Sequence, residues 1–230
     1  MKRLLIFTLA LLSLGSATVS GQGVVVDQGR FVVLVAGREV GSEEFVIRRA
    51  GLGSGDAIFA SGVVTLRSGA QTQEVRPLLR VTPLDGSAES YQVTVSGREA
   101  ADIRLARSGR RYVATIRTAE GDEDREFQAR PETHVLELDV AHHYYFLRSM
   151  REGREGPVLV PRTRAQLTIV AADGVTEDLR LGPNVVSARK VVFTTDDGEV
   201  RMVWFDRQGR VLRVEIPATR YVAERTDLVG

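Results

Sequence analysis

The feature that most constrains the fold is an alternation of apolar and polar residues that glycine interrupts at intervals of about ten to twelve residues from Arg30 onward. Tyr91, Val93 and Val95, for example, share one face of an extended segment, and polar residues occupy the other. A period of two with one apolar face is typical of antiparallel sheets that have a single covered side. The chain is therefore expected to be all-β, an antiparallel meander.

Turn signals separate the predicted strands, because glycine adopts the positive φ of hairpin turns at little cost. They are Ser68-Gly69, Asp85-Gly86, Ser96-Gly97, Ser108-Gly109, Glu120-Gly121, Asp173-Gly174, Asp197-Gly198 and Gln208-Gly209. Further apolar faces are predicted at Ile103 and Leu105; Tyr112, Ala114 and Ile116; Leu167, Ile169 and Ala171; Val200, Met202 and Trp204; and Leu212, Val214 and Ile216. Each turn is expected to close a hairpin.

One segment departs from this rhythm and is predicted to be a short helix near 139–151. Val140, Tyr144, Leu147 and Arg151 recur there at helical spacing, and Tyr144, Leu147 and Met150 would form an apolar stripe. Asp139 precedes them and is a suitable N-cap, since its carboxylate can accept hydrogen bonds from the first free backbone N–H groups.

The stretch near 152–161 is rich in glycine and proline and is predicted to be a loop that divides two sub-meanders. Neither sub-meander repeats the other, so residues 22–230 are expected to form a single β domain. Many strands with one short helix leave two architectures open: a barrel, or a strongly curved open sheet that wraps a helix. Both create a concave apolar face, and the width of a barrel decides whether it encloses a cavity.

The first residues have the pattern of a secretory signal peptide. Met1-Lys2-Arg3 precede an apolar run that is too short to span a bilayer, and small residues follow it. We predict a signal peptide over 1–21, with cleavage near Gly21 and Gln22 or, alternatively, after Ala17. The protein is then expected to be exported, to the periplasm or the extracellular space, with no transmembrane segment in the mature chain.

Composition excludes several classes of function. The chain contains no cysteine, which excludes disulfides, thiol catalysis and a lipid-modified cysteine after the leader. Its formal net charge of +1 falls to about −1 without Lys2 and Arg3, so the charge balance predicts no nucleic-acid partner. A chain of 230 residues is long enough to bury a substantial core.

Several stretches together resemble a family of exported bacterial proteins of unknown function with a curved antiparallel β-sheet. The residues that carry the resemblance are Phe31–Phe45, Leu138–Arg148, Val203–Asp206, Gly209–Val214, Pro217 and Glu224-Arg225. Such proteins are similar in outline to periplasmic lipoprotein-localisation carriers, which hold acyl chains in the hollow of a half-barrel. The resemblance implies a protein that binds an apolar molecule, and it supplies no catalytic residues.

Histidines form one cluster in the sequence. His142 and His143 are adjacent and His134 is near them, and Glu137 or Asp139 could add a carboxylate. Adjacent histidines point to different sides of a helix or strand, so they rarely bind the same ion. We therefore expect no metal site, with one histidine in solvent and one packed among aromatic residues.

Other patterns that often carry catalysis are incomplete. Gly51–Gly55 places Ser54 among glycines but lacks the spacing of a nucleophile elbow, and it is expected to be a flexible loop. The acidic groups Glu43-Glu44, Asp122–Asp124 and Asp196-Asp197 show no sign of burial and are expected in solvent, the last two at turns. We therefore expect no catalytic residues, no cofactor and no enzymatic activity.

Aromatic residues are the strongest candidates for a ligand site, because concave pockets are lined by apolar and aromatic side chains with a few polar anchors. The candidate lining residues are Tyr144, Tyr145, Phe146 and Trp204. Arg148 or Arg201 is expected to anchor an anionic head group. The competing interpretation is that these aromatic side chains only fill the core between helix and sheet.

The leading hypothesis is an exported, non-enzymatic protein that binds a lipid or another apolar small molecule in the concavity of its sheet. The alternative is a structural or assembly factor of the cell envelope, which would contact an envelope protein through its sheet edges or its aromatic segment.

Overall fold

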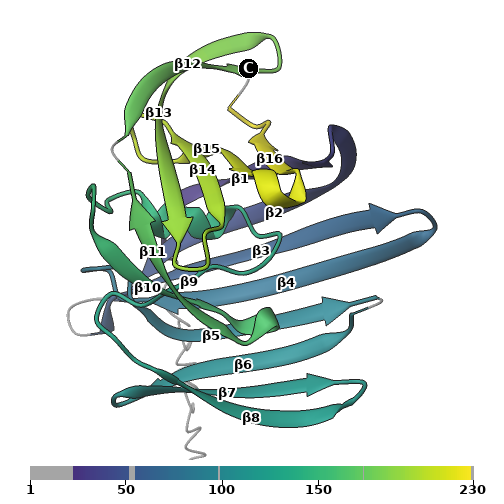
Figure 1. The fold of residues 1–230 in the computed structure, drawn as a ribbon, viewed down its shortest axis with the longest axis vertical. Helices are drawn as coiled ribbons and strands as arrows, with labels where there is room; N and C mark the ends of the chain where they lie inside the picture. Colours follow the sequence, from purple (N-terminus) through teal and green to yellow (C-terminus); the bar gives the residue numbers. More distant parts are fainter. Residues whose placement is uncertain (1–22, 52–54, 98, 173, 229–230) are drawn as a thin grey trace, which may run out of the picture.

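The computed structural model describes residues 23–51, 55–97, 99–172 and 174–228. The predicted signal peptide over 1–21 and the serine at position 54 lie outside these residues. One 16-stranded sheet dominates the fold and is antiparallel except at the pair β9–β10 (Figure 1). The prediction of an all-β fold is confirmed.

The strands are β1 (Val24–Val35), β2 (Arg38–Ala50), β3 (Ala57–Ser68), β4 (Gln71–Val81), β5 (Ala88–Ser96), β6 (Ala101–Ser108), β7 (Arg111–Thr118), β8 (Gly121–Gln128), β9 (His134–Val135), β10 (Glu155–Val160), β11 (Ala165–Ala171), β12 (Val175–Leu181), β13 (Asn184–Thr195), β14 (Val200–Phe205), β15 (Val211–Ile216) and β16 (Tyr221–Arg225). The helices are short 3₁₀ turns: η2 (His142–Leu147), η3 (Pro161–Thr163) and η4 (Pro217–Thr219). Among the described residues, no helix combines the length and apolar character that crossing a membrane requires.

The first and last strands lie side by side and join the two meanders. The strand order is β8-β7-β6-β5-β4-β3-β2-β1-β16-β15-β14-β13-β11-β10-β9, and β12 also pairs with β13. Arg225 on β16 forms a bidentate, buried ion pair with Asp27 on β1, with N···O distances of 2.8 and 2.9 Å. A bidentate fork of this kind fixes the relative position of the two strands as well as neutralising the buried charges.

The sheet curls strongly but does not close. At the seam the free edge of β8 approaches β11 and η3, and side chains bridge the gap in place of a backbone ladder. The Gln166 amide accepts a hydrogen bond from the Gln128 N–H (3.1 Å) and donates one to the Gln128 carbonyl (2.8 Å). Of the two predicted architectures, the strongly curved open sheet is the one observed.

Most predicted turns close hairpins between consecutive strands, as expected. The predicted turn at Asp173-Gly174 falls partly outside the described residues, because Asp173 is not described. The strands on either side of it, β11 and β12, both pair with β13 and not with each other. The stretch near 152–161, predicted to be a loop, instead contains the largely buried strand β10. Its apolar residues belong to the core, and glycine and proline were misleading signals here.

The predicted buried faces are confirmed on β5, β6 and β7, where apolar and polar side chains alternate between interior and solvent. On β14 the prediction was wrong. Arg201, Val203 and Phe205 face the interior, whereas Trp204 joins a second, smaller cluster with Leu212 on the other face. Leu179 and Leu181 of β12 cover this outer cluster, so both faces of β14 are buried and alternation could not distinguish them.

The predicted helix near 139–151 is shorter than expected. Only residues 142–147 are helical, as a 3₁₀ turn, and all six side chains are buried. Asp139 is not the N-cap: that position is Ala141, which has no side-chain capping bond, and Asp139 has a positive φ of 64°. Total burial removes the polar face on which a helical periodicity argument depends.

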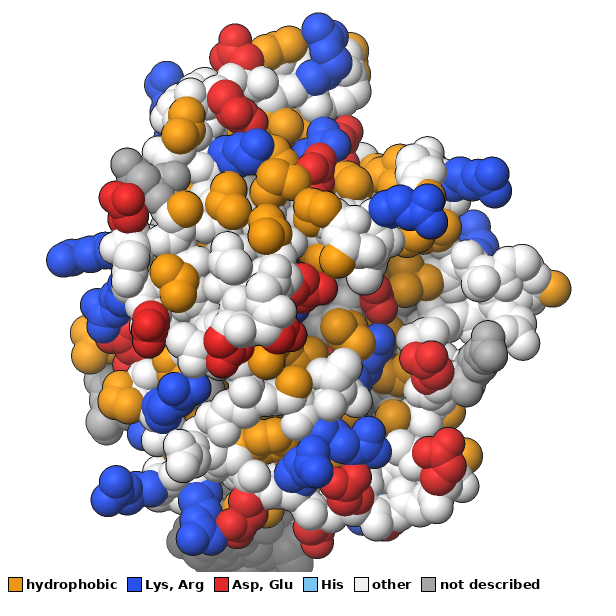
Figure 2. Space-filling view, viewed as in Figure 1, with side chains coloured by type: hydrophobic (Ala, Val, Ile, Leu, Met, Phe, Trp, Pro, Cys, Tyr) orange, Lys and Arg blue, Asp and Glu red, His pale blue; other side chains and the backbone are white. Residues whose placement is uncertain are grey.

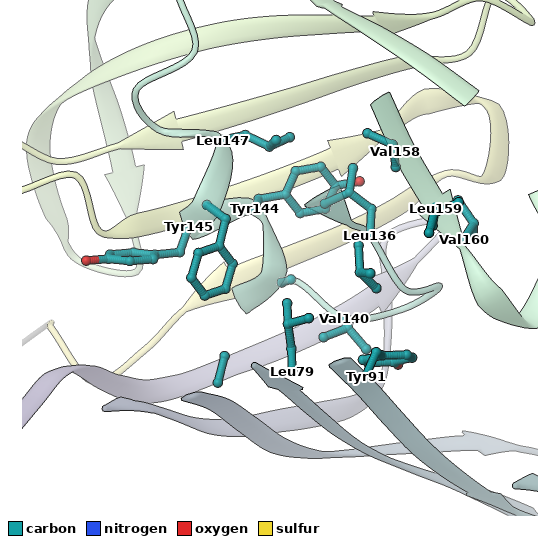
Figure 3. Packing of buried hydrophobic residues seen from close by; sticks show 14 of the residues in the cluster. Leu79, Tyr91, Leu136, Val140, Tyr144, Tyr145, Leu147, Val158, Leu159 and Val160 are labelled. Carbon is teal, nitrogen blue, oxygen red and sulfur yellow. The ribbon is translucent and has the colours of Figure 1, made fainter. Parts of the chain in front are cut away.

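The core lies between the concave face of the sheet and residues 134–150, which we call the interior segment. It carries β9 and η2 and contributes Val135, Leu136, Val140 and Tyr144 to the main hydrophobic cluster. Figure 3 shows Val140 near Leu79 and Tyr91 of the sheet, and Tyr144 directed toward Leu136. The concavity is therefore filled by the chain itself.

We expect Leu79→Ala to lower the free energy of unfolding by about 2–5 kcal/mol, because this side chain is 1% exposed and its loss leaves a cavity in the core. Leu84→Ala is the matched control, since Leu84 is 96% exposed, and its effect should stay within about 0.5 kcal/mol. Urea unfolding followed by circular dichroism measures both, and equal effects would contradict the assignment of the core.

Candidate functional site

A buried carboxylate on β2 holds the interior segment in place. Both Glu43 and His142 have fully buried side chains. The Glu43 carboxylate accepts hydrogen bonds from the backbone N–H groups of Ala141 (2.7 Å) and His142 (3.0 Å), and it also pairs with His142 Nδ1. These N–H groups begin η2, which lacks a capping side chain of its own. Glu43 thus does at long range what a capping residue does locally.

The contact of Glu43 with Ala141 and His142, which we call the clamp, continues into further polar side chains in the core. The His142 and His143 rings meet edge to face with centroids 4.7 Å apart, and His143 meets Tyr91 in the same manner at 5.7 Å. His143 Nδ1 accepts a hydrogen bond from the Glu137 N–H (3.3 Å), while the Tyr91 hydroxyl donates to the Glu137 carboxylate (3.0 Å). Sheet and interior segment are therefore connected by polar contacts as well as by apolar packing.

Arg162 of η3 ends this chain of polar groups. Its Nε lies 3.4 Å from a Glu137 oxygen, and its Nη2 donates a hydrogen bond to Asp139 (3.2 Å). The Arg162 side chain is 10% exposed, and its buried Nη1 has no hydrogen-bond partner among the described residues.

Burial shifts the pKa values of several of these groups. It raises the pKa of Glu137 to about 7, even though Arg162 and the Tyr91 hydroxyl favour the ionised carboxylate. It lowers the pKa of His134 to about 4 and that of His143 well below its ordinary value. Both histidines are therefore neutral at physiological pH, whereas Glu137 is poised near its titration point.

The expectation that one histidine faces solvent was wrong, because His134, His142 and His143 are all buried. The expectation that Glu43 is solvated was wrong for the same reason. Within the part of the chain that the structure describes, no group of three or more histidine or carboxylate side chains is arranged to hold a metal ion.

A hollow of about 360 Å³ opens at the seam of the sheet, beside Arg162. Its lining comes from the β5–β6 turn, from β6 and β7, from the β7–β8 turn and from the end of η3. The lining residues are Gly97, Glu99, Ala100, Ala101, Ile103, Ile116, Thr118, Ala119, Glu120, Arg162 and Arg164. We call it the seam hollow. It lies where the β5–β6 and β7–β8 turns face η3.

A wider groove of about 570 Å³ lies on the other side of η3, where Leu138, Val160 and Leu167 form apolar walls beside Arg201. Arg201 is already paired with Glu199, whose carboxylate accepts its Nε–H at 3.0 Å. A cavity of only about 20 Å³ continues inward from this groove to Tyr144. That volume holds about one water molecule, which is too little for a lipid chain.

The structure separates the residues that the sequence suggested as one site. Tyr144 and Arg201 line the same small cavity. Tyr145 points to the opposite side of η2 (Figure 3), where the Arg148 guanidinium lies 3.8 Å from its ring centroid.

The other two candidates lie elsewhere. Phe146 packs edge-on against Tyr145 at 5.5 Å and lines a separate hollow with His134. Trp204 lies on the outer face, where its indole N–H donates a hydrogen bond to Glu177 (2.7 Å). Five consecutive histidine and aromatic positions in η2 cannot converge on one ligand, and these side chains are buried in the core.

Sequence reasoning missed the residues that form the polar chain. Glu43, Phe45 and Ile47 occupy every second position of β2 and share its buried face. This spacing was the one local signal that Glu43 points inward. Glu137 and Arg162 had no such signal, because their pairing depends on how η3 folds back over the interior segment.

Glu43→Ala should lower the free energy of unfolding by at least about 3 kcal/mol, since it leaves two backbone donors and His142 without their buried acceptor. Glu44→Ala is the control: it lies on the same strand with a side chain 70% exposed, and its effect should stay within about 0.5 kcal/mol. Urea unfolding followed by the fluorescence of Trp204, the single tryptophan, reports both values. A small loss for Glu43→Ala would show that the clamp does not hold the interior segment.

His134 should make the protein less stable in acid. Its pKa is about 4 when folded and 6.5 ordinarily, so its contribution is fully present above pH 6.5 and is lost as the pH falls toward 4, by about 3 kcal/mol. Glu137 acts in the opposite direction, because a raised carboxyl pKa favours folding at low pH and this contribution is lost as the pH rises through about 7.

The variant His134→Gln separates the two effects, because Glu137 titrates in both proteins. Unfolding measured between pH 4 and 7.5 should show a smaller loss of stability toward acid in the variant than in the wild type. Parallel curves for the two proteins would mean that His134 is not held in its neutral form by burial.

Comparison with known proteins supports the fold. No protein-family model and no curated protein sequence matches the chain. Among solved structures, the crystal structure of a β-barrel-like protein of the domain of unknown function DUF1849 from Brucella abortus superposes with a TM-score of 0.53. The superposition covers 86% of this chain and 94% of that one at 6% sequence identity. The chain is thus similar in fold to a β-barrel-like protein of unknown function.

Proposed function

We propose that this protein, once exported to the periplasm or the extracellular space, binds a lipid or another apolar small molecule in the seam hollow and catalyses no reaction on it. The observation that carries the proposal is the hollow itself, which lies where the curled sheet fails to close and has a volume of about 360 Å³. Binding sites for small molecules usually measure about 300–1,000 Å³ and combine apolar walls with a few polar groups.

The walls of the seam hollow combine apolar residues with charged ones. Ile103 and Ile116 face inward from neighbouring strands and are paired across β6 and β7. Ala101 extends the apolar wall toward the open end of the hollow. Arg162 and Arg164 supply polar groups on the facing side. Ile103 and Ile116 are each 2% exposed, so an apolar ligand would cover mainly Ala101, at about 25 cal/mol per Å² of apolar surface buried.

The proposed site differs from the aromatic one that the sequence suggested. The interior segment fills the centre of the sheet, so a ligand is placed at the seam instead. The analogy with lipoprotein-localisation carriers then reduces to a shared type of architecture, a curved sheet with a concave side, and the ligand is bound at the margin of that concavity.

An envelope assembly role is less well supported. The aromatic residues Tyr144–Phe146 are buried and cannot contact a partner in this conformation. The free edge strand β8 carries mostly charged side chains that are exposed, a pattern that discourages strand pairing. On the face seen in Figure 2, acidic and basic side chains are interspersed, so a partner selected by a single sign of charge has no broad target there.

The variant Ala101→Trp tests the proposal, because an indole at this position fills the hollow. Binding of the neutral dye N-phenyl-1-naphthylamine, followed by its fluorescence, should weaken at least tenfold. Ala106→Trp is the matched control on the same strand, since Ala106 faces solvent and its replacement should leave dye binding unchanged.

Organic-solvent extraction of the protein, purified after export and analysed by mass spectrometry, should yield a lipid-like molecule that Ala101→Trp lacks. A wild-type protein that binds no dye and carries no extractable ligand would overturn the proposal. Equal dye binding by the wild type and Ala101→Trp would also overturn it, because the hollow would then not be the site.

A further inference from the structure

The seam of the sheet is held differently from the junctions between neighbouring strands elsewhere. β8 is the last strand at one end of the sheet, and its ladder with β7 runs through eight residue pairs, from Arg111↔Gln128 to Thr118↔Gly121 (Figure 1). On the other side of β8, no backbone hydrogen bond among the described residues joins it to η3 or β11. The seam is therefore closed by side chains.

One contact at the seam imitates a single rung of a β-ladder. The Gln166 side-chain amide accepts a hydrogen bond from the Gln128 N–H at 3.1 Å and donates one to the Gln128 carbonyl at 2.8 Å. A neighbouring strand would continue such bonds along β8, whereas a side chain supplies them at one residue only. Gln128 is exposed, so water can replace both bonds when they break.

The second contact is a charged cluster beside the seam hollow. The Glu123 carboxylate accepts a hydrogen bond from Arg164 Nε at 2.7 Å across the seam, and it lies 3.3 Å from Arg125 Nε on its own strand. Arg125 Nη1 in turn donates to the Arg164 carbonyl at 3.3 Å. The side chains of Arg164 and Glu123 are 35% and 38% exposed. Ion pairs this exposed add little to stability and weaken further in salt.

These contacts close over apolar residues of β7. Glu123 and Arg125 are the cross-strand partners of Ile116 and Ala114, so all four side chains are on the same face of the sheet. Ile116 lines the seam hollow at 2% exposure, and Ala114 is fully buried. Separation of β8 from η3 would enlarge the hollow and uncover this apolar wall, and it would break no backbone ladder.

We propose that the seam is a gate, through which the ligand of the seam hollow enters when the β7–β8 hairpin moves away from η3 and β11. The backbone ladders of the sheet stay intact during this movement, because the seam itself has none. Local openings of a protein occur where its contacts are weakest, and binding sites are often closed by elements of this kind. The entry route rests on the proposed function, whereas the opening of the seam does not.

Reaction of a single buried cysteine with iodoacetamide measures the opening, because the native chain contains no cysteine. Ala114→Cys places the thiol behind the seam. Ala60→Cys is the matched control: both alanines are 0% exposed, but Ala60 lies on β3, which has a ladder on each side. Ala114→Cys should react at least tenfold faster than Ala60→Cys. Equal rates would overturn the gate, since only unfolding of the whole protein would then expose either thiol.

The variant Glu123→Gln weakens the gate directly, because it leaves Arg125 and Arg164 facing each other without their shared carboxylate. Combined with Ala114→Cys, it should raise the rate of thiol reaction at least threefold. Combined with Ala60→Cys, it should leave the rate unchanged.

The control on the same strand is Glu126→Gln. Glu126 is 54% exposed and pairs with Arg111 within the hairpin, so its replacement should change neither rate. If Glu123→Gln has no more effect on Ala114→Cys than Glu126→Gln has, the ion pair does not hold the seam and the gate as described is wrong.

Stopped-flow association of N-phenyl-1-naphthylamine tests whether a ligand enters through the seam. Glu123→Gln should raise the association rate at least threefold, whereas Glu126→Gln should match the wild type. An unchanged rate in Glu123→Gln, together with faster thiol reaction, would overturn the seam as the route of entry. If the wild type binds no dye, the proposed function fails, and the thiol rates still decide whether the seam opens.

Hydrogen exchange of the wild-type protein, followed by NMR, provides a measurement that needs no cysteine variant to fold. The Gln128 N–H is bonded across the seam, whereas the Ala129 N–H donates to the Arg110 carbonyl beside β7 at 3.0 Å. Gln128 should exchange at least tenfold faster than Ala129, because opening of the seam frees only the first of these amides. Equal exchange rates would contradict the gate.

Discussion

The Glu43 carboxylate is the contact on which the remaining structure depends. A curved sheet with one apolar concave face needs a cover, and this chain provides it with its own residues 134–150. This interior segment contains the 3₁₀ turn η2, and the N–H groups at the start of η2 donate hydrogen bonds to Glu43. Glu43 is 98 residues away from Ala141 in the sequence. Burying a carboxylate is costly unless every oxygen has donors, and here both oxygens do.

That cover also determines where a ligand can bind. Because η2 and the residues before it fill the centre, the space left over lies at the seam, where the sheet does not close. The same segment supplies Glu137 and Asp139, which orient the Arg162 fork at that seam. The clamp, the polar chain and the hollow therefore form one continuous arrangement, in which the packing of the core and the shape of the proposed site are coupled.

Prediction from sequence succeeded where one face of a strand is buried and failed where both are. The faces of β5, β6 and β7 follow strict alternation, and the turns between them contain glycines at positive φ, such as Gly109. On β14 the outer cluster buries Trp204 as well, and a bulge between Trp204 and Phe205 shifts the register. The residues of the candidate site are separated for a related reason: every side chain of η2 is buried, and successive side chains point to different sides of the turn.

The sequence by itself determined the β class, the meander order and most of the hairpin turns, because alternation and turn chemistry act between residues that are close along the chain. The tertiary structure decided that the sheet stays open, that Glu43 points into the core and that Arg162 faces Glu137 and Asp139 beside a hollow. These features join residues that are far apart in the chain, as Asp27 and Arg225 are, and no local pattern encodes such pairings. They follow from the curvature of the whole sheet and from the segment that fills it.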